Sequence, residues 1–137
     1  MKMIESRIDS IKDDLELFDD DLQKYEYIID LGKSLPNLEE EHKKDENLVQ
    51  GCTSKVWLIC EKKDDILVFK ADSNAAIVKG LVKIILTIFN NLSAKEILDF
   101  DTQILQKLNL QEIITPNRQS GVQGMIKRIK EYAKAFA

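Results

Sequence analysis

The chain of 137 residues has the length of one domain and can bury a hydrophobic core. Apolar residues make up 44% and charged residues 32%, a composition that excludes a disordered or fibrous chain. With only 5 Gly and 2 Pro, the sequence offers little material for a linker. We therefore expect a single domain over residues 1–137.

Charge is distributed unevenly along the chain, whose net charge is −4. Residues 1–50 hold seven Lys and Arg against fifteen Asp and Glu, a net charge of −8, whereas residues 51–117 are neutral and residues 118–137 carry +4. The acidic first third would repel phosphates, so nucleic acid is not expected as a partner. Solvated helix faces of opposite sign account for most of these charges.

No segment predicts contact with a membrane. The most apolar run, residues 84–89, is far shorter than the ~20 residues of a spanning helix. Charged residues stand at once in the N-terminal segment, where a signal peptide would place an apolar core. Two cysteines without an export signal favour a reducing cytoplasm, in which both are thiols.

Two helices are expected first. Over residues 3–18 apolar side chains recur every three or four positions, the spacing of one helical face. A second helix should follow the acidic run 19–21, whose carboxylates suit a positive helix N-terminus, and end at Gly32 shortly before Pro36. The polar residues that follow, up to Asn47, predict a loop.

A β-hairpin comes next. Residues 55–61 and 66–70 are rich in strand-forming side chains, and the charged residues between them predict a turn. Residues 48–50 are expected to add a third strand. Asp72 or Ser73 is placed to cap the following helix, whose apolar residues lie on nearly every side and predict the buried centre of the fold.

The last third predicts helices. Ser93 and Glu96 have the spacing of a capping box, residues 101–109 share an apolar face, and residues 119–135 form a basic amphipathic helix after a break at residues 115–117. The order of elements predicts the α+β class, with a small, mostly antiparallel three-stranded sheet packed by helices.

Cys52 is the candidate for chemistry because of its context. It follows Gly51 and precedes Thr53 and Ser54, in a polar turn between two strand-like segments. A reactive thiol on such a turn can reach a partner's active site. Packing as a small hydrophobe is the other common fate of a free cysteine, and from the residues alone both interpretations stay open.

The remaining polar residues favour no other chemistry. Cys60 shares a period-two alternation with Val56 and Leu58, so strand packing explains it. The two cysteines form neither a redox pair nor a zinc cluster, and with His42 they fall short of four cluster ligands. We therefore expect no metal and no cofactor on this chain, and His42 is expected to be a solvated surface residue.

Four segments resemble one family. Residues 50–57, QGCTSKVW, resemble the QGCxSxVW signature of SufE-type sulfur acceptors, and residues 72–81, DSNAAIVKGL, are similar to the family's DSDAAIVKGL stretch. Residues 27–36 resemble its second helix, and residues 115–121 resemble its TPSR…G segment. Asn74, Asn117 and Gln119 depart from the usual residues. The resemblance implies a SufE/IscU-like fold.

The resemblance also implies a function. Cys52 would accept sulfur as a persulfide from a cysteine desulfurase of the SufS or CsdA type and pass it to a SufB-containing scaffold for iron–sulfur cluster assembly. Pyridoxal phosphate would sit on the desulfurase. The protein would thus act as a sulfurtransferase through a persulfide rather than as a stand-alone enzyme, and would stimulate the desulfurase.

Supporting residues are expected around Cys52. Arg118 is the candidate for holding the segment or favouring the thiolate, with the N-terminus of the helix near Ser73 as the second candidate. We expect the Cys52 thiol to be partly shielded by apolar neighbours in the resting protein. The further support residues are Gln50, Gly51, Ser54, Trp57, Asp72 and Ser73.

Two other functions remain open. The chain could be a non-catalytic adaptor that activates the desulfurase without carrying sulfur. It could also be a thiol enzyme of its own, although the sequence shows neither a base nor a resolving cysteine beside Cys52.

Overall fold

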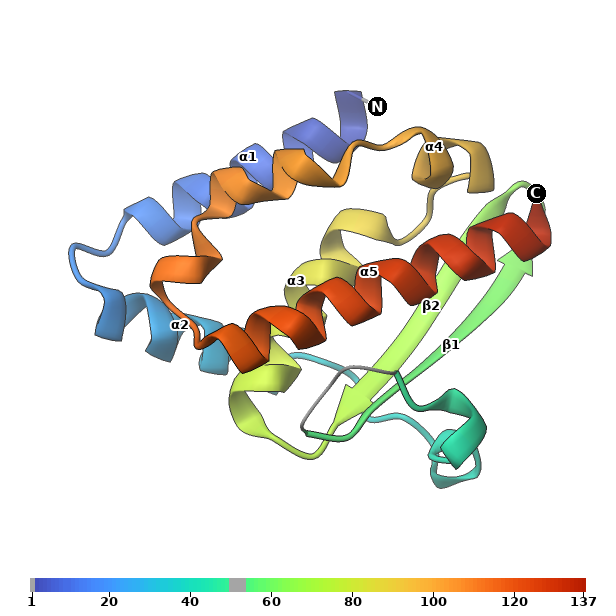
Figure 1. Cartoon of the computed structure of the whole chain (residues 1–137), viewed down its shortest axis with the longest axis horizontal. Coiled ribbons are helices and arrows are strands. Elements are labelled where there is room, and N and C mark those ends of the chain that lie inside the picture. The colour runs from blue at the N-terminus through green and yellow to red at the C-terminus, as the bar shows by residue number, and fades with distance from the viewer. Residues whose placement is uncertain (1, 50–53) are drawn as a thin grey trace.

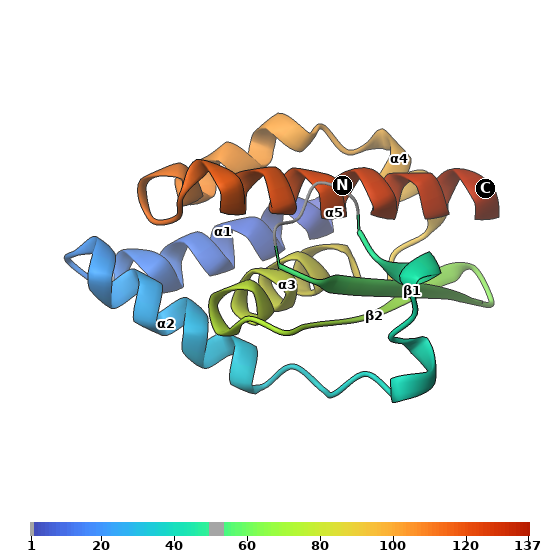
Figure 2. The same cartoon turned by 60° about the horizontal axis from the view of Figure 1, so that its bottom comes forward.

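The computed structural model describes residues 2–49 and 54–137 and has the expected α+β class. Helices and a β-hairpin are layered around one helix (Figures 1 and 2). The elements in chain order are α1 (Lys2–Glu16), α2 (Asp21–Lys33), the 3-10 helices η1 (Glu40–His42) and η2 (Asp45–Asn47), β1 (Val56–Lys63), β2 (Ile66–Ser73), α3 (Ala76–Phe89), α4 (Ala94–Asp99), the 3-10 helices η3 (Thr102–Leu108) and η4 (Leu110–Glu112), and α5 (Pro116–Phe136). Among these helices, none combines the length and apolar composition that crossing a membrane requires.

Helix α3 is the buried centre, as its sequence predicts. It contacts α1, α2, β2 and α5, which surround it (Figures 1 and 2). Ile84, Ile88 and Phe89 are almost completely inaccessible to solvent. Because apolar side chains project from nearly all sides of α3, a single covering layer would leave part of them in water. The surrounding elements therefore meet the burial requirement of one helix.

Two glycines allow α2 and α3 to pack closely. A Cβ atom added to Gly32 would lie 2.7 Å from the backbone nitrogen of Gly80, and one added to Gly80 would lie 2.0 Å from the carbonyl oxygen of Ile28. Neither distance is sterically possible. The prediction that Gly32 ends the second helix is therefore wrong: Gly32 lies inside α2, which continues to Lys33, and its role is close helix contact.

The hairpin has the predicted strands and turn. β1 and β2 pair antiparallel in a register that sets Val56 opposite Ser73 and Cys60 opposite Phe69. One face of the hairpin points into the core, and it includes Val56, Leu58 and Phe69. The tight turn lies at Asp64 and Asp65, with Asp64 in the left-handed region.

The predicted third strand is wrong in extent. Within the described ranges the sheet has two strands, and Leu48 joins it only through an isolated bridge to Trp57. The 3-10 helix η2 ends at Asn47, so Leu48 and Val49 are the described residues left to extend along β1 before residue 50. The 3-10 helix η2 therefore prevents the strand-like segment from extending toward the N-terminus.

The cap of α3 also differs from the prediction. Asp72 and Ser73 belong to β2, and α3 begins at Ala76 with Ala75 as its N-cap and no side-chain cap. The register of the hairpin extends pairing to Ser73, because Val56 has its partner there. Ser73 Oγ still accepts a hydrogen bond from the Ala75 amide at 3.3 Å, so it stabilises the strand-to-helix turn from inside the strand.

The C-terminal third follows the predicted order. Ser93 and Glu96 form the capping box of α4, and Thr115 caps α5 with Pro116 in its first turn. The segment expected as a helix over residues 101–109 is the 3-10 helix η3, which runs alongside α1. Likewise, residues 36–47, expected as a loop, contain η1 and η2.

The glycine contact between α2 and α3 can be tested by substitution. We expect Gly80→Ala to lower the free energy of unfolding by about 1–3 kcal/mol, because the methyl group would force α2 and α3 apart. Urea unfolding followed by circular dichroism measures this. Thr87→Ala, at an exposed position of the same helix, is the control and should leave stability unchanged or slightly raised. Equal stability of both variants would contradict the close packing.

Candidate functional site

The site around Cys52, the predicted sulfur-bearing residue, is described from the residues on either side of it in the chain. Cys52, Gln50 and Gly51 fall outside the described residues, as does the expectation that the Cys52 thiol is shielded. The residues on either side, Val49 and Ser54, are described. The site is therefore built from the contacts of these flanks and of the elements that they touch.

The flank before Cys52 is fastened to the sheet. The Val49 amide donates to the Val56 carbonyl at 2.9 Å, and Leu48 forms its bridge with Trp57. The Val49 side chain is buried in the core. The chain thus enters the Cys52 segment from a fixed point beside the start of β1.

The flank after Cys52 is held by the end of β2. Ser73 Oγ donates to the Lys55 carbonyl at 2.7 Å, and the Asn74 amide N–H donates to the same oxygen at 3.3 Å. The Lys55 amide N–H donates in turn to Asn74 Oδ1 at 3.2 Å. Both backbone groups of the third residue after Cys52 are therefore satisfied by the strand-to-helix turn that precedes α3.

Arg118 contacts this flank. Its Nη1 donates to Ser54 Oγ at 2.8 Å, a contact between residues 64 positions apart. Arg118 lies in the first turn of α5, where its own amide donates to the capping Thr115 Oγ1. The guanidinium thus binds a residue that stands two positions after Cys52 in the sequence, while the helix cap holds the backbone of Arg118.

A small apolar cavity lies beside Ser54 and Arg118. Its volume is about 20 Å³, and Val56, Val78 and Met125 are among the residues that line it. Val56 is buried. A space of this size holds little more than one water or one small group.

Asp72 is buried but binds another segment. Its carboxylate accepts from the Leu38 amide at 3.3 Å and lies 3.7 Å from both Lys43 Nζ and Lys79 Nζ. The side chain is 4% exposed. Its described contacts therefore fasten the residues around Leu38 to β2 and α3, while the neighbouring Ser73 is the residue that contacts the Cys52 flank.

Trp57 contacts Lys43, the same lysine that lies near Asp72. It is half-buried on β1, and Lys43 Nζ lies 5.6 Å from the centre of its ring, within the range of a cation–π contact. Trp57 is thus connected to Asp72 through Lys43, and to the flank before Cys52 through the Leu48 bridge.

Cys60 is a packing residue. It is half-buried on the core face of β1 and packs against the hydrophobic core. Burial, with a smaller contribution from the Glu61 carboxylate, raises the pKa of the Cys60 thiol to about 11. The thiol is therefore protonated near neutral pH and is a poor nucleophile.

His42 lies at the surface, as expected. Its imidazole and the carboxylates of Glu39 and Glu41 bring potential ligand atoms within 4.8 Å of one another. Both glutamates are exposed, and acidic side chains commonly gather at a surface without a metal. We assign no metal site to these three residues.

Sequence reasoning missed two contributors. Asn74 departs from the family pattern, yet it holds both backbone groups of Lys55. The pairing of the hairpin indicates this contact: Val56 pairs with Ser73, so the next residue, Asn74, lies opposite Lys55. Lys43, which joins Asp72 to Trp57, has no such signal because it lies in an irregular acidic segment.

Comparison with known proteins places this fold in a class associated with iron–sulfur metabolism. The SufE family model, described as an Fe-S metabolism associated domain, matches residues 9–133. The chain belongs to the SufE family, and its general role is in iron–sulfur metabolism.

Similar proteins agree with this assignment. The chain is 40% identical to an uncharacterized SufE-like protein of Rhizobium etli, over 99% of the chain and 95% of that protein. It is 41% identical to another from Rhizobium meliloti, over 93% and 94% respectively. The solution structure of a hypothetical protein from Thermus thermophilus shares the fold, with a TM-score of 0.76 at 12% identity over 94% of each chain.

The raised pKa of Cys60 predicts slow alkylation. In a Cys52→Ser variant, which leaves Cys60 as the single thiol, iodoacetamide at pH 8 should react on the order of a hundredfold more slowly than with a free thiol of pKa about 8.5. The thiolate fraction should then rise with pH up to about 11, and the rate with it. Mass spectrometry follows the reaction, with glutathione as the reference. A rate that levels off near pH 8.5 would contradict the assignment.

Proposed function

We propose that this protein accepts sulfur on Cys52 as a persulfide from a SufS-type cysteine desulfurase, stimulates that enzyme, and relays the sulfur for iron–sulfur cluster assembly. The recipient in this proposal is a SufB-containing scaffold. The protein would act in the cytoplasm, with pyridoxal phosphate on the desulfurase and no cofactor of its own.

The observation that carries the proposal is the fastening of both flanks of residues 50–53. Val49 is bound to Val56, Lys55 to Ser73 and Asn74, and Ser54 to Arg118. A short segment between two fixed points on a sheet is where proteins place reactive side chains. The family's general role in iron–sulfur metabolism supports a chemical task for the cysteine in that segment.

The proposed reaction is a thiol exchange. The Cys52 thiolate attacks the terminal sulfur of the desulfurase's cysteine persulfide, and the bond between the two sulfurs of that persulfide breaks. The products are Cys52 persulfide and the thiolate of the desulfurase cysteine, so no external oxidant or reductant is needed. The rate depends on the thiolate fraction of Cys52 and on access to it.

Arg118 is our candidate for favouring that thiolate. Its guanidinium carries a positive charge and is held at Ser54. A second positive influence is the N-terminus of α3, which begins just after Asn74, the residue that binds Lys55. In the proposed mechanism both favour the anionic form of the attacking sulfur, and Arg118 also fixes the flank.

Persulfide formation provides the first test. After incubation with a SufS-type desulfurase and L-cysteine, mass spectrometry should detect one added sulfur on the wild-type chain and on Cys60→Ser, and none on Cys52→Ser. Cys60→Ser is the matched control because the half-buried Cys60 thiol packs against the core and has a raised pKa.

A different result would favour the adaptor function. If no chain gained sulfur while Cys52→Ser stimulated the desulfurase as strongly as wild type, the protein would activate its partner without carrying sulfur. Sulfur found on Cys60 alone would also contradict the proposal.

The contact between Arg118 and Ser54 gives a second test. We expect Arg118→Ala and Ser54→Ala each to slow sulfur transfer about tenfold, the equivalent of one hydrogen bond to a charged group. Because both remove the same contact, the double variant should be little slower than either single variant. Single-turnover transfer measured by quenched mass spectrometry gives these rates. Independent, multiplying effects, or a normal rate in Arg118→Ala, would overturn the assigned role.

A further inference from the structure

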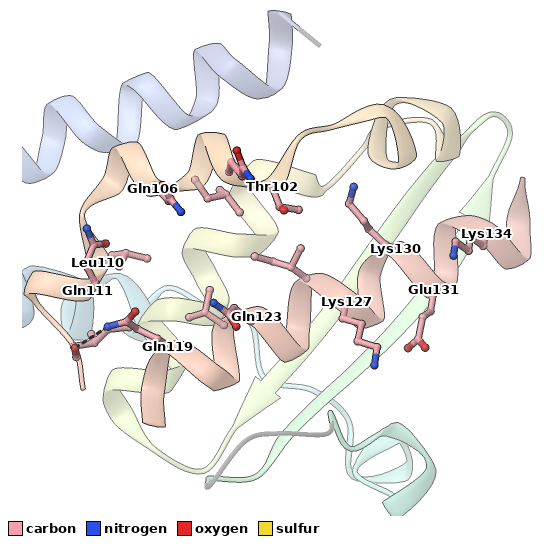
Figure 3. A pocket seen from close by; sticks show the side chains of 15 residues that line it. Thr102, Gln106, Leu110, Gln111, Gln119, Gln123, Lys127, Lys130, Glu131 and Lys134 are labelled. Atoms are coloured by element: carbon pink, nitrogen blue, oxygen red, sulfur yellow. Dashed lines mark hydrogen bonds between the residues drawn. The ribbon is translucent and has the colours of Figure 1, made fainter. Parts of the chain in front are cut away.

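A second surface feature, apart from the Cys52 flanks, is a groove along α5. It lies between α5 and the segment of residues 102–114 that contains η3 and η4, and its volume is about 600 Å³ (Figure 3). Apolar side chains form much of its lining, among them Leu105, Leu110, Val122 and Ile126. We call this feature the α5 groove.

Lysines stand along the α5 side of the groove. Figure 3 shows Lys130 pointing from α5 toward the end of the facing segment at Thr102, whereas Lys127 points away from that segment, at the outer edge of the groove, and Lys134 lies nearer the end of the helix. Lys130 Nζ donates to the Phe100 carbonyl at 2.7 Å. Lys127 and Lys134 are exposed, and neither ammonium group has an ion-pair partner among the described residues. Glu131 is the acidic residue of the lining, so the lysines leave it net positive.

Negative charge and exposed apolar side chains occur together at the turn between α1 and α2. Residues 13–22 contain six carboxylates and no lysine or arginine. Leu17 is 78% exposed and Leu22 67%, the highest values among the large apolar side chains of the described residues. Figures 1 and 2 both place this turn at one end of the molecule, where it projects outward. We call residues 13–22 the acidic corner.

Much of the charge of the acidic corner is uncompensated. Within the described part of the chain, Asp13, Asp19 and Asp21 have no ion-pair partner, while Asp20 caps α2 and Glu16 pairs with Lys12. Like charges concentrated in ten residues repel one another, so an external cation is favourable there. The corner thus offers two exposed leucines together with three carboxylates that have no ion-pair partner among the described residues.

We propose that the α5 groove of one copy of this chain binds the acidic corner of a second copy. Leu17 and Leu22 enter the apolar part of the groove, and the carboxylates beside them face Lys127 and Lys134. Two features that are unfavourable in an isolated chain, exposed leucines and uncompensated like charges, are both relieved by this one contact.

The contact is heterologous, because a corner meets a groove rather than another corner. Each copy carries both surfaces, so the contact either closes reciprocally between two copies or continues into longer assemblies. Exposed charge pairs contribute little each, and only two leucines become buried, so the association should be weak and sensitive to salt. The contact does not depend on sulfur transfer, and the groove includes none of the residues that hold the Cys52 flanks.

Sedimentation equilibrium of the full chain tests the proposal. Between about 10 µM and about 1 mM at low salt, reversible self-association of wild type is expected, and 1 M NaCl should weaken it because the screening length falls to about 3 Å. Lys127→Glu/Lys134→Glu and Asp19→Lys/Asp21→Lys should each weaken association about tenfold or more. A mixture of these two variants should associate again, since the reversed groove of one then matches the reversed corner of the other.

The control is Lys63→Glu/Lys95→Glu, which makes the same change in net charge at exposed lysines outside the groove and should associate like wild type. Circular dichroism confirms that each variant is folded. A wild-type chain that stays monomeric to 1 mM, or a variant mixture that fails to associate, overturns the proposal. A monomeric wild type whose desulfurase binding is lost in Lys127→Glu/Lys134→Glu would assign the groove to that enzyme instead.

Discussion

The structure depends on the burial of α3. Apolar side chains project from nearly all sides of this helix, so it must be covered by α1 and α2 on one part of its surface and by β2 and α5 on others. The glycines at positions 32 and 80 bring α2 close enough to exclude water from that contact. One helix that cannot be left exposed thus fixes the relative positions of elements distant in the sequence.

The position of the Cys52 flanks follows from that arrangement. β2 packs on α3, and its last residue, Ser73, lies opposite Val56, the first residue of β1. The strand-to-helix turn therefore meets the chain just after Cys52 and binds Lys55 there. α5 crosses the same end of the hairpin and brings Arg118 to Ser54. The flanks are held by hydrogen bonds from three elements that α3 keeps in place.

Sequence patterns predicted the helices and strands better than the boundaries and contacts between them. The periodic helices, the hairpin and the capping box at Ser93 could be predicted, because each depends on residues close together in the chain. The extent of the third strand, the start of α3 and the role of Gly32 could not, since each is decided by a contact across the fold. For the site, a motif pointed to Arg118, which contacts Ser54, whereas no pattern pointed to Lys43 because its partners Asp72 and Trp57 are distant in sequence.

In the proposed chemistry Cys52 carries the sulfur, whereas Cys60 matters because it is a second thiol that could attack the persulfide. A persulfide on one thiol of a protein is readily converted to an internal disulfide when a second thiolate can attack it. Here the second thiol, Cys60, has its pKa raised to about 11 by burial, so very little of it is thiolate at neutral pH. In the proposed relay, a persulfide on Cys52 would therefore meet little Cys60 thiolate that could attack it. The burial of Cys60 thus favours the proposed relay.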